Sequence, residues 1–152
     1  MKLGEALTIR SELQSRFQLL RERLKVSVVV QEGEKPPEDP NALLKELDEV
    51  AAEIEQLVGR INKTNLATTL ADGKTLTDAL ARRDHLGLLQ SALHQVAEAA
   101  SAAQARYGRA EIRIVRTVEV AALRQRADEL AKERRELDAR IQEANWQTEL
   151  MS

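Results

Sequence analysis

The sequence predicts an all-α protein in which four long helices form two antiparallel αα-hairpins, as in an up-down bundle. The composition is the first indication, because charged residues make up 32% of the chain and aromatic residues only 2%. A core built from aliphatic side chains with so many charges is typical of long helices. Apolar residues also recur at alternating steps of three and four along four segments, which indicates amphipathic helices. Glycine, proline and asparagine residues separate these segments.

The first helix is predicted over residues 3–28. Apolar residues recur there at helical spacing, with Arg10 as one polar residue in the series. A β-branched cluster, Val26–Val30, follows it and disfavours helix. Three prolines and Gly33 then predict a loop over 31–40. The apolar positions of this helix are Leu3, Ala6, Leu13, Phe17, Leu20 and Leu24.

The second helix is predicted to begin at Asp39 and Pro40. Asp39 suits the N-cap, and Pro40 suits the first helical position, where a missing N–H costs nothing. The helix is predicted to end near 62–65. Its apolar positions form an unbroken heptad series: Leu43, Leu47, Val50, Ile54, Leu57 and Ile61.

The third and fourth helices are predicted on both sides of a loop near Gly108. Asp72-Gly73 is typical of a tight turn, and Thr75 with Asp78 resembles a capping box that opens the third helix. Gly108 can end that helix. The fourth helix starts near Val120 and has one polar position in its apolar series, Arg134.

A short two-stranded β-ribbon is predicted at one tip of the bundle. Residues 111–118 partly alternate between apolar and polar, as a strand does. An up-down-up-down arrangement would bring them to the same end as residues 26–32. We therefore expect these two segments to pair.

The chain also shows signs of an internal duplication within one domain, residues 1–152, with halves of about 1–70 and 71–152. A shift of 80 residues aligns Arg60-Ile61 with Arg140-Ile141, and a shift of 73 aligns residues 3–7 with 76–80. Chance agreement between helices of similar composition is the alternative. The duplication would make Glu5 and Arg10 the counterparts of Asp78 and Arg83, as ion pairs between helices or as solvated charges.

No motif predicts catalysis, a cofactor, a metal site or a small-molecule substrate. The chain has no cysteine, and the phosphate-binding and nucleophile motifs are missing. His85 and His94 are nine residues apart on one helix, so they point to opposite faces and cannot bind one metal ion together. We therefore expect a protein that is not an enzyme.

The third helix predicts self-association. Besides its main apolar series it carries Leu88, Ala92 and Ala99 on another side, so it is expected to be buried from several directions. It is either the central helix of the monomer or a contact with another subunit. A homo-oligomer with a structural or interaction role is the leading hypothesis, and a twofold contact is the commonest form.

A basic patch near the third loop gives an alternative function, the binding of nucleic acid or phosphate. Its residues are Arg106, Arg109, Arg113 and Arg116, with Tyr107 as the one aromatic side chain there. A solvated or ion-paired surface explains the same arginines. The formal net charge of −2 argues against a general binder of polyanions.

The sequence predicts a cytoplasmic location and no membrane span. Glu5 interrupts the run that a signal peptide would need. No stretch reaches the roughly 18–20 apolar residues of a spanning helix.

Several segments resemble a known family. They are Arg140-Ile141-Gln142-Glu143-Ala144-Asn145-Trp146 with Thr148-Glu149-Leu150, Ile61-Asn62-Lys63-Thr64-Asn65, and Val30-Gln31-Glu32-Gly33. They are similar to the small bacterial proteins labelled septicolysin-like. The resemblance implies a helical bacterial protein without an established mechanism or catalytic residues. The label also implies a membrane-active, cytolysin-like alternative.

Overall fold

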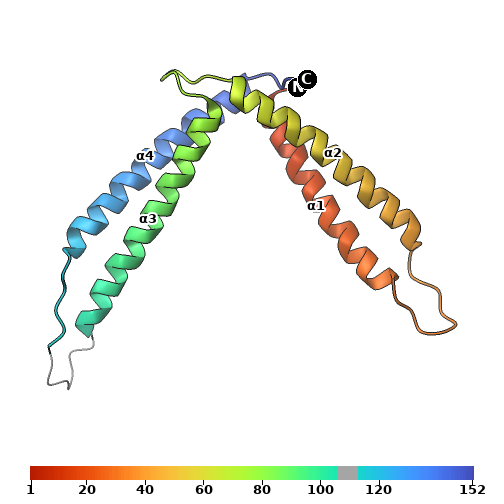
Figure 1. Cartoon of the computed structure of the whole chain (residues 1–152), viewed down its shortest axis with the longest axis horizontal. Helices are drawn as coiled ribbons and strands as arrows, with labels where there is room; N and C mark the ends of the chain where they lie inside the picture. Colours follow the sequence, from red (N-terminus) through yellow and green to blue (C-terminus); the bar gives the residue numbers. More distant parts are fainter. Residues whose placement is uncertain (106–112) are drawn as a thin grey trace. The chain divides into compact units, whose positions relative to one another are not determined.

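The structure, a computed structural model, describes residues 1–105 and 113–152 (Figure 1). In these residues the chain forms α1 (Leu3–Ser27), α2 (Pro40–Ala67), α3 (Leu76–Ala105) and α4 (Val120–Gln147). Of the residues that the structure describes, 76% are helical. The predicted all-α class and the four helices are confirmed.

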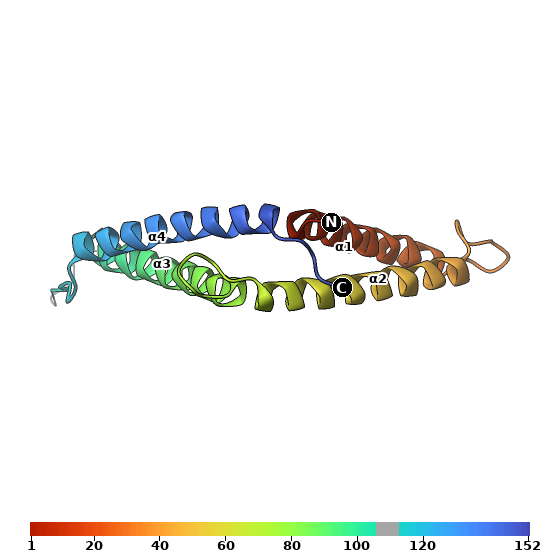
Figure 2. The same cartoon turned by 90° about the horizontal axis from the view of Figure 1, so that it is seen from above.

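The helices pack in consecutive pairs. α1 lies beside α2, and α3 lies beside α4 (Figures 1 and 2). The chain divides into two compact units: the first contains Met1–Thr69 with Ala144–Ser152, and the second contains Leu70–Glu143. Each unit therefore contains one hairpin, as the short connections between the helices predict, except that the last residues of α4, from Ala144 onwards, belong to the first unit.

The helix starts form where the cap signals predict them. Asp39 accepts a hydrogen bond from Asn41 N (3.0 Å), with Pro40 as the first residue of α2. At the start of α3, Thr75 N donates to Asp78 Oδ2 (3.1 Å) and Asp78 N donates to Thr75 Oγ1 (3.1 Å). This reciprocal pair is the predicted capping box.

The turn before α3 is also confirmed. Gly73 adopts a φ of 82°, which favours glycine. Its N–H donates to Leu70 O at 2.9 Å, and Lys74 N donates to Asp72 Oδ1 at 3.1 Å. An Asx turn therefore reverses the chain at Asp72.

The predicted ribbon is wrong for the residues that the structure describes. No strand occurs in 26–32 or 113–118, and residues 111 and 112 lie outside the described part. α1 continues to Ser27, and Glu34 N then donates to Gln31 O across a turn at Gly33, whose φ is 86°. Helix and turn together leave too few extended residues for a strand between them.

The apolar core of each unit lies between its paired helices. In the first unit Leu20, Leu24, Leu43 and Val50 form a buried cluster. In the second unit Leu86 and Ala127 are fully buried. The predicted apolar series therefore face the partner helix of each hairpin.

The C-terminal residues complete the first unit by joining the start of α1 to the end of α2. Leu3 N donates to Thr148 O and Leu150 N donates to Met1 O, each at 2.9 Å. Met151 N donates to the buried Thr64 Oγ1 at 3.0 Å. Residues at the two ends of the chain thus share one hydrogen-bond network.

Hydrogen bonds at matching positions support the proposed duplication. The bond from Leu150 N to Met1 O (2.9 Å) has a counterpart from Leu70 N to Lys74 O (2.8 Å), at the offsets of 80 and 73 residues. Lys2 N donates to Glu5 Oε2 (2.7 Å) as Thr75 N does to Asp78 Oδ2 (3.1 Å). The duplication itself stays a prediction.

Candidate functional site

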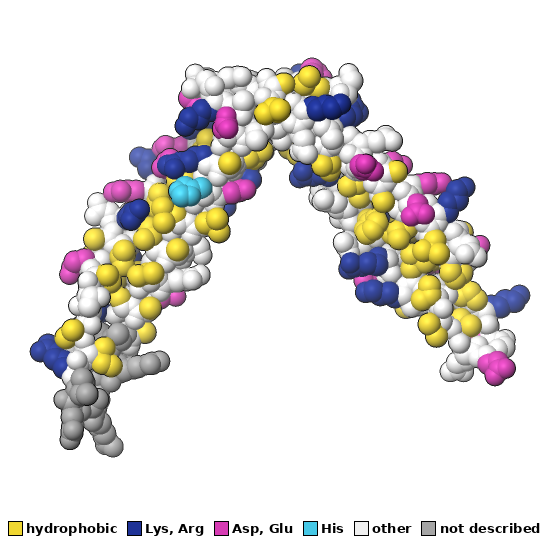
Figure 3. Space-filling view, viewed as in Figure 1, with side chains coloured by type: hydrophobic (Ala, Val, Ile, Leu, Met, Phe, Trp, Pro, Cys, Tyr) yellow, Lys and Arg dark blue, Asp and Glu magenta, His cyan; other side chains and the backbone are white. Residues whose placement is uncertain are grey.

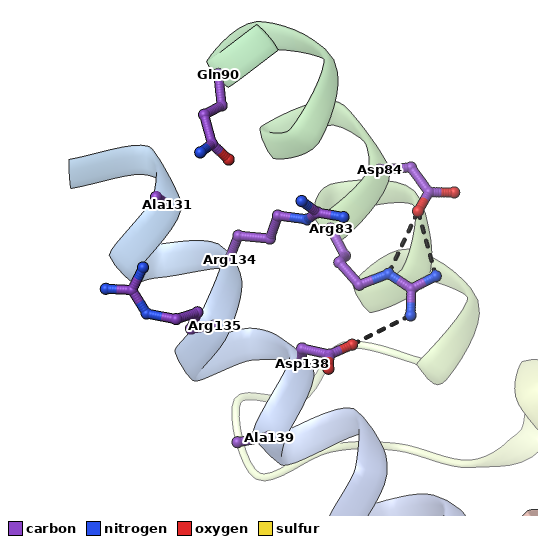
Figure 4. Close-up of a pocket in the computed structure, with 8 residues that line it drawn as sticks. All are labelled: Arg83, Asp84, Gln90, Ala131, Arg134, Arg135, Asp138 and Ala139. Carbon is purple, nitrogen blue, oxygen red and sulfur yellow. Dashed lines mark hydrogen bonds and ion pairs between the residues drawn. The ribbon is translucent and has the colours of Figure 1, made fainter. Parts of the chain in front are cut away.

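A pocket between α3 and α4 in the second unit brings together several charged and polar side chains (Figure 4). Its volume is about 490 Å³. α3 and α4 contribute its polar and small lining residues, which are Arg83, Asp84, Gln90, Ala131, Arg134, Arg135, Asp138 and Ala139.

Arg83 connects the two helices at one end of the pocket. Its Nη1 donates to Asp138 Oδ1 at 3.2 Å, across from α3 to α4. Its Nε and Nη2 donate to Asp84 Oδ1, both at 3.3 Å. Asp84 and Asp138 therefore share one guanidinium, so the positive charge of Arg83 is already offset.

Arg134 extends from α4 towards α3, and Gln90 extends from α3 into the same space (Figure 4). A Cβ atom at Gly87 would lie 3.3 Å from Arg134 Cζ and 3.4 Å from its Nε. The missing side chain at Gly87 thus gives the guanidinium room against the backbone of α3. Within the described part of the chain, the guanidinium groups of Arg134 and Arg135 make no hydrogen bond and no ion pair.

The four repeat-related charges have different surroundings. Glu5 and Asp78 each accept the backbone N–H three residues earlier, at the first turns of α1 and α3. Hydrogen bonds from the Thr75 side chain and backbone lower the pKa of Asp78. Arg83 forms the ion pair between helices described above.

Arg10 lacks the partner that Arg83 has. Its Nε atom is buried and without a hydrogen bond. At an offset of 80 residues, Val58 occupies the position of Asp138. Of the four predicted residues, only Arg83 therefore forms an ion pair between helices in the described part of the chain.

The described part of the predicted basic tip is exposed. Arg113 and Arg116 both lie on the surface, and Arg116 Nε donates to Ala100 O at 2.9 Å. Arg106 and Arg109 lie outside the described residues. The nucleic-acid alternative stays a prediction.

The predicted self-association face is exposed on α3. Leu88 has 74% of its surface exposed, and Ala92 and Ala99 are exposed as well. Hydrophobic side chains at the surface, yellow in Figure 3, are found along both hairpins.

The described residues contain neither a cluster that could hold a metal ion nor a helix that could span a membrane. Over 1–105 and 113–152, no three or more histidine, aspartate or glutamate side chains gather closely enough to hold a metal ion. In those ranges, no helix combines the length and the apolar character that crossing a membrane requires.

Sequence reasoning did not predict the pocket, although one signal for it was present. Arg134 is the polar residue in the apolar series of α4. The apolar series of α4 does not identify the residues of α3 that lie opposite Arg134. Their identity depends on how the two helices are rotated against each other. Gly87 and Gln90 become part of the site only when α3 and α4 are packed together.

Comparison with known proteins places the chain in a family. Residues 10–150 match the model of DUF6847, a family of unknown function. The chain belongs to DUF6847. No curated protein matches the sequence.

A crystal structure similar to this DUF6847 chain has been solved for a functionally unknown conserved protein from Corynebacterium diphtheriae. The two share 44% sequence identity over 99% of each chain, with a TM-score of 0.93. Neither comparison carries the septicolysin-like label. The expected helical family without an established function is therefore found, and the label has no support.

Proposed function

We propose that this DUF6847 protein has a structural or interaction role as a non-enzymatic helical protein that self-associates, with the outer face of α3 packing against a second copy. The non-enzymatic part rests on the absence of catalytic motifs from the sequence. One observation supports the self-association: from Leu88 onwards, the side of α3 that points away from α4 is exposed and carries a charge only at its edge, at Glu98.

The geometry of an α-helix places this outer face opposite the buried series. Leu86, Leu93 and Ala97 are buried in the hairpin. Leu88 is two residues from Leu86, which is about 200° around the helix. Its 74% exposure agrees with that position, and Val96, on the edge of the same face, is 47% exposed.

From Leu88 onwards the centre of the outer face carries no charged residue, and Glu98 lies at its edge, about 80° around the helix from Leu88 on the side opposite Val96. Its exposed side chains are Leu88, Ala92, Gln95, Val96, Ala99 and Ala102, which are all small or apolar except the uncharged Gln95. A solvated helix surface in a chain that is 32% charged would carry charges here. Alanines also allow two helices to approach closely, towards the short end of the usual 8–10 Å between helix axes.

A second copy is the occupant that this face suits best. A twofold axis uses the same patch on both subunits, so one self-complementary stripe is sufficient. Leucine and alanine side chains on one copy can pack into the spaces between those of the other. No charge has to be matched across such a contact.

The test compares Leu88→Glu with Leu19→Glu. Leu19 is a 59% exposed leucine on α1, so both variants place a carboxylate at an exposed helical position. Burial of a leucine contributes about 1.5–3 kcal/mol, and each dimer would lose it twice. We expect Leu88→Glu to weaken the dimer at least about tenfold and Leu19→Glu to leave it unchanged.

Light scattering after size-exclusion chromatography measures the result. Circular dichroism checks that both variants keep the helical content of the wild type. Equal masses for Leu88→Glu and the wild type would rule out the outer face of α3 as the contact.

A further inference from the structure

The pocket between α3 and α4 has the features of an anion site, and this is independent of self-association. Two of its guanidinium groups, on Arg134 and Arg135, have no partner in the described residues. Both nearby carboxylates, on Asp84 and Asp138, are already held by Arg83. The pocket therefore carries positive charge that the protein itself does not offset.

The predicted duplication allows the pocket residues to be compared with the residues at the corresponding positions of the first hairpin. At the offsets of 80 and 73 residues, Ile54 stands in place of Arg134 and Phe17 in place of Gln90. Ile54 and Phe17 pack against the buried cluster of the first unit. The second hairpin has an arginine and a glutamine there, with a pocket between the helices.

A purely structural role does not account for this replacement. With an arginine in the apolar series of a helix, the hairpin loses the stabilisation that a buried aliphatic side chain would contribute at that position. Gly87 adds a further cost, because glycine inside a helix is less stabilising than alanine. Both residues weaken the hairpin, and together they place one guanidinium in an open pocket.

We propose that this pocket binds a small molecule through its phosphate group, with Arg134 as the principal ligand-binding residue. A guanidinium donates two parallel hydrogen bonds to phosphate oxygens. Arg135 adds a second positive charge, and the Gln90 amide supplies a further donor. The three arginines and two aspartates of the lining leave one net positive charge, and the donors of two guanidinium groups match the oxygens of a phosphate better than the two oxygens of a carboxylate.

The size of the pocket agrees with a ligand that extends beyond the phosphate group. A volume of about 490 Å³ lies within the range of roughly 300–1,000 Å³ of small-molecule sites. The alanines at 131 and 139 line it beside the polar groups. A phosphate monoester would therefore have its phosphate at Arg134 and the rest of the molecule along α4.

Isothermal titration of the full chain with inorganic phosphate, at constant ionic strength set by sodium chloride, tests the proposal. The variants are Arg134→Gln and, as a matched control, Arg126→Gln, an exposed arginine of α4 outside the pocket. We expect saturable binding of one phosphate per chain by the wild type and by Arg126→Gln. Arg134→Gln should bind about tenfold more weakly or worse, because it loses a charge-assisted hydrogen-bond pair.

A double variant separates ligand binding from folding. Arg134→Ile with Gln90→Phe copies the residues of the first hairpin, so we expect a higher melting temperature and no phosphate binding. Acetate, titrated in parallel into the wild type, tests the chemical class. The proposal is overturned by wild-type protein that shows no saturable binding, by equal affinity in Arg134→Gln, or by acetate that binds as tightly as phosphate.

Discussion

At the scale of single residues, two glycines illustrate how the same residue type serves different purposes. A Cβ atom at Gly4 would lie 2.8 Å from Trp146 Cδ2, so the indole occupies the place of a side chain. At Gly59, inside α2, a Cβ atom would meet nothing within 4 Å. Only the first glycine is required by packing.

Alanine substitutions should therefore have opposite effects at these two positions. Gly4→Ala forces the Trp146 ring to move, and overpacking of this kind costs typically 1–3 kcal/mol. Gly59→Ala should stabilise the protein by roughly 0.5–1 kcal/mol, because alanine is the better helix former. Urea unfolding at equilibrium measures both, and destabilisation by Gly59→Ala would contradict the open surroundings of that position.

The capping box of α3 predicts a pH dependence at the residue scale. Hydrogen bonds from Thr75 lower the pKa of Asp78 below its usual value. A carboxylate whose pKa is lowered by folding stabilises the protein above its unfolded pKa, near 3.9, and this contribution is lost as pH falls through the folded value. The stabilisation should thus be complete at neutral pH and absent once the pH lies well below the lowered pKa of folded Asp78.

Asp78→Asn tests this dependence. We expect the variant to be less stable than the wild type at neutral pH and the difference to shrink in acid. Thr75→Val removes the side-chain donor, the largest cause of the lowered pKa, so it should weaken the same dependence. A difference between wild type and Asp78→Asn that stays constant from neutral pH into acid would exclude a role for the charge of Asp78.

At the scale of the elements, local signals predicted most of the fold. Asp39 and Pro40 marked the start of α2, and Thr75 with Asp78 marked that of α3, because caps depend on residues a few positions apart. The ribbon failed because the β-branched cluster that ends at Val30 is followed at once by the turn from Gln31 to Glu34. A strand pattern of that length is too short to determine pairing.

The candidate site was less accessible to sequence reasoning than the helices. Arg134 could be recognised because it interrupts the apolar series. Gly87 and Gln90 could be recognised as site residues only from their position opposite Arg134 in the structure. Contacts between α3 and α4 depend on how the helices are rotated, which heptad spacing defines only approximately. For the same reason the pattern marked Arg83 as a candidate for an ion pair without identifying Asp138 as its partner.

At the scale of the whole molecule, the chain forms two helical hairpins. Its N-terminal and C-terminal residues are hydrogen-bonded to each other within the first unit. The hydrogen bonds from Leu150 to Met1 and from Met151 to Thr64 were not predicted, because they join residues far apart in sequence without an apolar pattern. The hairpins themselves followed from long apolar series and short connections. The exposed outer face of α3, which does not belong to the buried apolar series, is the basis of the proposed self-association.

Sedimentation velocity of the wild-type protein over a concentration series tests that central claim most directly. The chain mass is 17.0 kDa. With α3 packed against a second copy, the protein should sediment at about twice this mass at micromolar concentrations and shift towards the monomer on dilution. A single species at the monomer mass across the whole series would contradict the account.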